Sequence, residues 1–589
     1  MFSAKHFLKF ILYTLLLPNR GYMSGNLLTP TVIWKDFAAC EIQSEILSRA
    51  TINGFAVAHM RISGEKTEDG AVGIYGVLVR KAQIDIAPAI VLVQDFNSGD
   101  SLTLAETLAD KGYSVLCLDL AGETDFNLAK SVEGVEKPYT LYPDSLNFAN
   151  FNEERENRTE IEGDASTTCW FAWGRVIRYA VEYLKAEPLT SKIAVMGFGR
   201  AATPLWQVIS ADCGISCAVI AANAGWKGYR GIDKFGDTPE PQFNDDALKY
   251  LAGIEPQAYA AHVKCPLLLL SPTNNPDFDI DRAYDTVSRV PEKIYSAADY
   301  SVGSRYEISA DCFDGALCFL EQFLLKRKPS LAGDISLKGD LTGGAVKVEV
   351  LPDVKGLKNL SVYFSEEEIS SALRFWNREN KAVSEKDGVY EFEYTPYQSS
   401  GAVMFFARAE YENGQKICSN IICKKFDADK TTQINRRRVF YSSRMAVGVN
   451  GFYPANEVSN GAIKVNLDKD AIVKIKNGPM DIAGLCCKNG LLTFKINAKK
   501  YKPSDGAMFM LDVFAHGGDF CVKAITDVFG KKTEYVATVS LIGDFWQNVQ
   551  FELANFKTQE GMSLKSYENV EALEFFASGE FLINNLLWV

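Results

Sequence analysis

The chain has 589 residues, of which 47% are hydrophobic and 23% charged, a composition typical of a globular protein with large cores. Its length predicts about three or four domains. The net charge of −12, from 62 basic and 74 acidic side chains, and the lack of a basic stripe with interleaved aromatic residues exclude a nucleic-acid-binding surface.

The first 25 residues are an N-terminal extension that allows two explanations. A basic start leads into a short apolar run at 11–17, which is too short to cross a bilayer, and no small-residue cleavage site follows it. Met23 is a second candidate start, directly before the globular pattern begins. We therefore expect no membrane span and favour a misassigned start and a cytoplasmic protein, with an export signal and secretion as the alternative.

The thirteen cysteines also favour a reducing compartment. None of them forms a CxxC pair, so neither a zinc ribbon nor a thioredoxin-type site is indicated. Cys117 and Cys265 lie in apolar stretches, where a thiol behaves as a small hydrophobic group. We expect free, buried thiols, no metal and no cofactor.

Residues 26–328 predict an α/β domain with a doubly wound, mostly parallel sheet. Two or three strands at 52–80 come first, and strands then alternate with helices. Continuous apolar strands separated by helices are typical of a parallel sheet that is covered on both faces. The predicted strands are "AIVLVQDF", "YSVLCLDL", "IAVM", "SCAVIAANAG" and "CPLLLLSP".

Two all-β sandwich domains are predicted after this α/β domain. Alternating apolar and polar stretches at 332–426 indicate an antiparallel sandwich of the immunoglobulin or fibronectin type. A polar, basic linker follows at 427–437, and residues 438–589 are again all β. The middle sandwich carries no recognisable chemistry, so we interpret it as a spacer or as a surface for a protein partner.

The stretch "KIAVMGFGRAATPLW", at 192–206, predicts a sharp turn between a strand and a helix. Many hydrolases mount a serine nucleophile on such a turn, in the pattern Gly-x-Ser-x-Gly. Here Gly197 and Ala201 flank the pattern, and the central position is Gly199, followed by Arg200. The residue at this tip adopts a positive φ, which glycine tolerates at almost no cost, so the turn persists without a nucleophile.

Residues 52–328 resemble the α/β-hydrolase superfamily, in its dienelactone-hydrolase and acetyl-xylan-esterase-like branch. The resemblance covers just under half of the chain and implies a serine, a histidine and an acid that work together. The matching stretches are "VLVQDFNSGD", "LADKGYSVLCLDLAG", "YTLYPDSLNFAN", the helix with Trp170 and Trp173, "IAVMGFGRAATPLWQVISAD" and "CPLLLLSPTNNPDFDIDRAYDTVS".

Position by position, the implied site is degenerate. Gly199 offers no hydroxyl, and the stretch before the last helix, "YSAADYSVGSRYEISADCF", holds no histidine; the histidines of the chain are His6, His59, His262 and His516. Asp277, with Asp279 and Asp281, follows the strand where the acid is implied, although surface carboxylates or helix caps explain these residues as well. Backbone oxyanion donors are implied at Arg200 and in the loop 95–98.

The last domain resembles the jelly-roll carbohydrate-binding modules. The resemblance lies in "FWQNVQFELANFKTQEGMSLKSYENVEALEFFASGEFLINNLLWV". Sugar binding needs exposed aromatic faces, for which Tyr453 and Trp546 are the candidates, beside Phe452 and Tyr501. Each of these rings has the alternative of packing in the sandwich core.

Two functions remain open from the sequence. The favoured one is a catalytically degenerate, esterase-like protein that binds a carbohydrate or a small acylated ligand. The alternative is an active carbohydrate esterase of the acetyl-xylan-esterase type, in which an acid such as Asp277 activates water. Neither the identity of the ligand nor the oligomeric state follows from the sequence.

Overall fold

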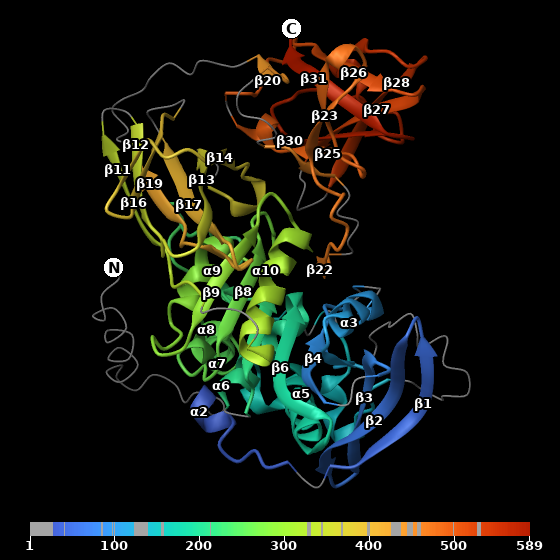
Figure 1. Cartoon of the computed structure of the whole chain (residues 1–589), viewed down its shortest axis with the longest axis vertical. Coiled ribbons are helices and arrows are strands. Elements are labelled where there is room, and N and C mark those ends of the chain that lie inside the picture. The colour runs from blue at the N-terminus through green and yellow to red at the C-terminus, as the bar shows by residue number, and fades with distance from the viewer. Residues whose placement is uncertain are drawn as a thin grey trace.

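The structure is a computed structural model of the whole chain (Figure 1). It describes residues 27–39, 42–83, 86–96, 98, 101–122, 139–152, 154, 158–211, 214–326, 331–342, 345–366, 369–396, 401–425, 438–444, 451–455, 461–498, 500–526 and 532–589. The predicted N-terminal extension and the predicted linker at 427–437 lie outside these residues.

The α/β region, residues 27–326, is built on a long twisted sheet. An antiparallel edge leads into six parallel strands, and β5 lies between β3 and β4 in space although it follows β4 in the chain. In spatial order the strands are β1 (Ser44–Ile52), β2 (Phe55–Thr67), β3 (Gly70–Lys81), β5 (Ser114–Leu118), β4 (Ala87–Val93), β6 (Thr190–Phe198), β7 (Cys217–Ala221), β8 (Leu267–Pro272) and β9 (Ser296–Ser301).

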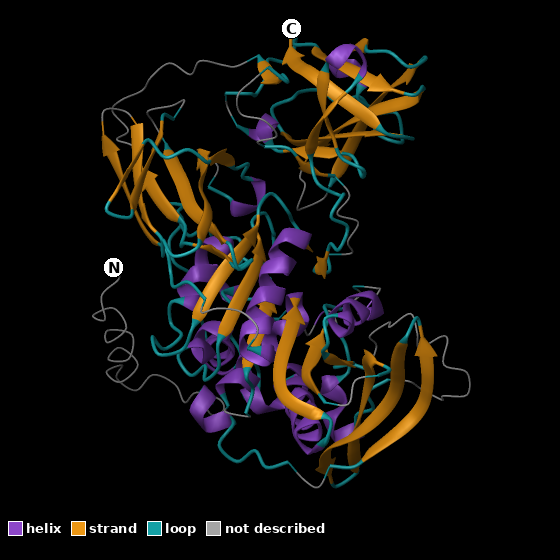
Figure 2. Cartoon of the chain, in the orientation of Figure 1, coloured by secondary structure: helices purple, strands orange, loops and turns teal. Residues whose placement is uncertain are grey.

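Helices cover both faces of this sheet, as Figure 2 shows. They are α2 (Pro30–Ile33), α3 (Ser101–Asp110), α5 (Cys169–Ala186), α6 (Thr203–Ser210), α7 (Asp245–Gly253), α8 (Pro256–Ala260), α9 (Ile280–Val287) and α10 (Ala310–Leu320). All seven residues of β4 are buried, and successive ones contribute to the cores on opposite faces, as expected for a strand covered on both sides. The predicted fold class is confirmed: the strand order is that of an α/β-hydrolase.

The middle region, residues 331–425, continues the same sheet. Strand β18 (Lys416–Cys418) pairs with β9 at Cys418 and Ala298, and the sheet runs on through β17 (Ala402–Tyr411), β13 (Leu357–Glu366) and β14 (Asn377–Glu379), with β19 (Ile422–Lys425) also on β17. A four-stranded sheet faces it: β11 (Ser336–Thr342), β12 (Ala345–Leu351), β16 (Val389–Tyr394) and β15 (Ser384–Lys386). The edge of the α/β sheet is therefore covered by the chain itself.

The last region, residues 438–589, consists of two antiparallel sheets around one core. The first holds β23 (Lys474–Asn477), β24 (Ala483–Cys486), β31 (Phe581–Trp588), β26 (Phe509–Ala515) and β29 (Gln547–Phe551), with β20 (Val439–Tyr441) on β31. The second holds β21 (Tyr453–Pro454), β25 (Leu491–Thr493), β30 (Val570–Ala577), β27 (Gly518–Thr526) and β28 (Thr533–Leu541). No helix in the described part of the chain is long and apolar enough to cross a membrane.

Candidate functional site

The predicted turn between strand and helix is present at the carboxyl end of β6. The chain passes from β6 through a short helical turn at Gly199–Ala202 into α6. Gly199 has φ +54°, the left-handed conformation that the sequence predicts for this tip. A Cβ at Gly199 would lie 2.0 Å from Oδ2 and 2.2 Å from Cγ of Asp95, so the carboxylate of Asp95 fills the space that a nucleophile would need.

Asp95 is buried and holds three backbone N–H groups. Its Oδ1 accepts hydrogen bonds from the N–H groups of Phe96 and Arg200, both at 3.0 Å. Its Oδ2 accepts one from the N–H of Ile463, at 2.8 Å. The amide of Arg200 and one in the loop 95–98 are the groups implied as oxyanion donors, and both point at a carboxylate of the chain itself. Burial raises the pKa of Asp95 to about 6, against the lowering effect of Arg200 and the three N–H groups.

Ile463 brings a segment of the last region to this turn. Strand β22 (Lys464–Val465) pairs in parallel with β10 (Glu307–Ile308), and Figure 1 shows it reaching down from the last region to the α/β region. The side chain of Ile463 is buried in the core on one face of the α/β sheet. The segment therefore closes the carboxyl edge of the sheet, where open α/β folds bind their ligands.

The loop after β9, where the resemblance implies a histidine, is a second contact with the last region. The ring of Tyr453 lies directly on Gly303, because a Cβ there would be 1.8 Å from Tyr453 Cδ1. The hydroxyl of Tyr453 accepts a hydrogen bond from the N–H of Trp376, at 2.9 Å. Tyr453 is 6% exposed, so its ring offers no face to a sugar and the structure corrects our candidate. Phe452 and Tyr501 are buried in the same way.

The loop after β8, where the resemblance implies the catalytic acid, contacts the middle region. Its carboxylates pair with arginines and backbone groups rather than with a histidine. Asp281 forms a bidentate pair with Arg374, at 2.6 and 2.7 Å, and both side chains are buried. Asp279 caps α9 through the N–H of Asp281. Asp277 pairs with Arg230 at 2.5 Å near the surface. The three carboxylates thus have structural partners, which is the alternative that the sequence left open.

The histidines have structural or surface positions. His59 on β2 is buried, its Nδ1 lies 2.7 Å from the hydroxyl of Tyr75, and burial lowers its pKa. His262 is half-buried after α8, and His516 belongs to the last region. His6 lies outside the described residues. Among the residues that the structure describes, no cluster of His, Cys, Asp or Glu has the arrangement of a metal site.

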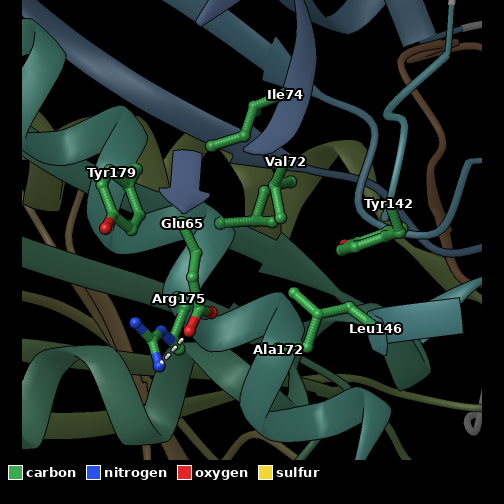
Figure 3. A pocket seen from close by; sticks show the side chains of 9 residues that line it. Glu65, Val72, Ile74, Tyr142, Leu146, Ala172, Arg175 and Tyr179 are labelled. Atoms are coloured by element: carbon green, nitrogen blue, oxygen red, sulfur yellow. Dashed lines mark ion pairs between the residues drawn. The ribbon is translucent and has the colours of Figure 1, made fainter. Parts of the chain in front are cut away.

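A small cavity lies between β2, β3 and α5 (Figure 3). Its volume is about 10 Å³, and it is lined by Val72, Ile74, Tyr142 and the ion pair between Arg175 and Glu65, at 2.8 Å. Burial raises the pKa of Glu65, and the nearby Arg175 opposes this effect. A cavity of this size holds about one water molecule and no substrate.

A larger hollow, of about 220 Å³, opens on the last region. It lies between the end of β23, the end of β26 and the start of β31. Its aromatic wall is Phe514, whose ring lies between that of Trp546, at 6.0 Å between centroids, and that of His516, at 5.4 Å. The predicted ligand-binding residue Trp546 is half-buried beside this wall and supports it rather than lining the hollow.

The opposite wall of the hollow is a strained turn. Pro479 lines the hollow, and the next two residues, Met480 and Asp481, have φ values of +60° and +56° although neither is glycine. Trp546 fixes this turn, because its Nε1 donates a hydrogen bond to the carbonyl oxygen of Pro479, at 3.2 Å. Such strain costs about 1–3 kcal/mol per residue and concentrates at functional sites, so we treat the hollow as the candidate binding site.

Comparisons with known proteins find likeness in fold. No protein-family model matches the chain, and no curated protein matches it in sequence. The acetyl xylan esterase from Paenibacillus sp. R4 is 14% identical, with a TM-score of 0.38 over 50% of this chain and 92% of that one. The chain resembles esterases in fold.

Two further solved structures have comparable values. Acetyl xylan esterase 1 from Thermoanaerobacterium sp. JW/SL YS485 is 15% identical, with a TM-score of 0.34 over 50% of this chain and 92% of that one. The acylaminoacyl peptidase of Pyrococcus horikoshii is 15% identical, with a TM-score of 0.32 over 48% of this chain and 43% of that one.

Several residues of these sites are not predicted from the sequence. The sequence points to the loop of Asp95 only for its backbone donors, and the role of its carboxylate appears in the structure. The hollow had a signal, because Phe514 lies near the end of an alternating strand and His516 follows two residues later, directly after that strand. Ile463 gave none, since nothing local marks its contact with Asp95.

Proposed function

We propose that this chain is a non-hydrolytic relative of the esterases that binds carbohydrate through its last region. The observation that carries the first half is the carboxylate of Asp95. It takes the place of the nucleophile and accepts the N–H groups that would stabilise an oxyanion. A negative charge in this position repels the anionic intermediate of ester hydrolysis, which oxyanion donors exist to stabilise.

Carbohydrate binding is supported by the hollow at Phe514. Sugar rings stack their apolar faces on aromatic side chains and use hydroxyl groups toward a polar rim. The hollow provides one aromatic wall and a rim with Lys476, Glu580 and His516. We do not propose a small acylated ligand at the turn between β6 and α6, because the Asp95 carboxylate lies where its acyl group would bind.

The alternative function, an esterase that uses Asp277 to activate water, has less support. Asp277 is paired with Arg230 at 2.5 Å, and its side chain is 30% exposed. A general base has to face the reacting water beside an oxyanion donor. The two implied donors face Asp95 instead.

Acetylated xylo-oligosaccharides test both halves of this proposal in one sample. We expect calorimetry to detect binding and an acetate assay to detect no release above a protein-free blank. Phe514→Ala should abolish binding, whereas Phe545→Ala, which removes an exposed ring outside the hollow, should preserve it. Saturable release of acetate, or binding that Phe514→Ala leaves intact, would contradict the proposal.

A further inference from the structure

Lys476 and Glu580, the charged side chains that line the hollow, are paired with each other, and His516 has a partner beside the hollow. Lys476 Nζ lies 2.6 Å from Glu580 Oε1, and His516 Nδ1 lies 2.8 Å from Asp544 Oδ1. The hydrogen bond between Lys476 and Glu580 raises the pKa of the lysine and lowers that of the glutamate. Both groups of this pair therefore stay charged at neutral pH.

Each pair places a hydrogen-bond donor beside an acceptor. A hydroxyl group is itself both donor and acceptor, so neighbouring hydroxyls on a sugar ring match such a pair without breaking it. A ligand carboxylate accepts only, so it can use the remaining N–H groups of Lys476 but finds no donor at Glu580, whose negative charge it has to approach. The rim thus discriminates between hydroxyl and carboxylate.

The size of the hollow limits the ligand further. Pockets for drug-sized molecules have volumes of about 300–1,000 Å³. The hollow has about 220 Å³, with the half-buried ring of Phe514 between Trp546 and His516, and the buried Phe581 also belongs to its lining. These dimensions suit one sugar ring rather than an extended oligosaccharide.

We infer that the hollow binds one neutral sugar ring and discriminates against the uronic acid of the same sugar. This inference rests on the proposed function and adds the class of ligand. The uronate should bind roughly tenfold more weakly, because its carboxylate lies close to the negative charge of Glu580 and meets one lysine whose charge Glu580 already balances. Phe514 supplies the stacking surface, and the pair of Lys476 and Glu580 supplies the discrimination.

Matched ligands test the inference on the full chain. Methyl β-glucoside and methyl β-glucuronide differ only at C6, as do the galactoside and the galacturonide, and ligand-observed NMR at millimolar concentrations measures their affinities. Glu580→Gln should reverse the preference, because it removes one negative charge and frees Lys476 to pair with the uronate. Glu534→Gln is the control, since Glu534 on β28 pairs with Lys523 on β27 and with Lys532, outside the hollow.

The outcomes separate this inference from the proposed function. Tighter binding of the neutral glycosides, reversed by Glu580→Gln and unchanged by Glu534→Gln, supports the inference. Equal or tighter binding of the uronides by the unaltered chain overturns it, while Phe514-dependent binding of any sugar leaves the proposed function intact. Binding of neither ligand class overturns both.

Discussion

At the scale of single residues, two positions fill the turn between β6 and α6. Gly199 keeps the left-handed conformation of the turn, and Asp95 occupies the space that a larger residue at 199 would fill. Three N–H groups converge on the Asp95 carboxylate, so removal of Asp95 would leave buried donors without partners, at about 1–3 kcal/mol each.

The raised pKa of Asp95 predicts a specific pH dependence of stability. Its pKa is about 6 in the folded chain and 3.8 ordinarily, so the folded state prefers the protonated form. Stability from this group is present below pH 4 and is lost as the pH rises through 6, by roughly 3 kcal/mol. Between pH 4 and pH 7, the free energy of unfolding of the unaltered chain should therefore fall relative to that of Asp95→Asn.

Urea unfolding of the two proteins at several pH values measures this gain. A constant offset between them is expected as well, because the amide of asparagine cannot accept all three N–H groups. A difference between the two proteins that does not change with pH would show that Asp95 does not titrate in this range.

At the scale of elements, the loops that carry catalysis in hydrolases here join the three regions. At the turn after β6, Asp95 accepts a hydrogen bond from the N–H of Ile463. In the loop after β9, the ring of Tyr453 packs on Gly303. In the loop after β8, Asp281 forms an ion pair with Arg374. Removing one partner of a buried ion pair, such as that of Arg374 and Asp281, lowers the free energy of unfolding by about 3–5 kcal/mol. The carboxyl edge of the α/β sheet is thus where the three regions contact one another.

Gly303→Ala should loosen this joint. The new Cβ would lie 1.8 Å from the ring of Tyr453, and φ at this position is +78°. The ring of Tyr453 must therefore move away from its packing position on residue 303. Gly231→Ala is the matched control, because φ there is +80° but nothing lies within 4 Å. Limited proteolysis should cut the segment between the middle and last regions several-fold faster in Gly303→Ala than in Gly231→Ala. Equal rates would mean that Tyr453 does not hold the last region in place.

At the scale of the whole molecule, the sequence predicted the regions better than their joints. The apolar strands of the α/β region carry their own signal, because a strand buried on both faces is a continuous run such as that of β4. The pairing of β18 with β9 has no comparable signal, since one residue pair on a three-residue strand fixes it. Contacts such as that of Asp95 with Ile463, 368 residues apart, leave no local pattern.

The candidate site shows the same division. The loss of the nucleophile and the positive φ at Gly199 follow from the sequence, because they depend on one residue and its turn. The hollow does not, because its walls come from three separate strands and the turn after β23. Trp546 is predicted as an exposed aromatic face for a sugar, yet Phe514 on β26 lines the hollow and Trp546 does not.

The most direct test of the closed catalytic site is a double-mutant cycle on Gly199 and Asp95, measured by urea unfolding. Gly199→Ala should cost about 4 kcal/mol in the unaltered chain, from overpacking against Asp95 and from its φ. In an Asp95→Gly background the same change should cost only about 1 kcal/mol, as should Gly112→Ala, which has a positive φ and open space. Equal costs of Gly199→Ala in both backgrounds would contradict the account, because the Asp95 carboxylate would then not fill the place of the nucleophile.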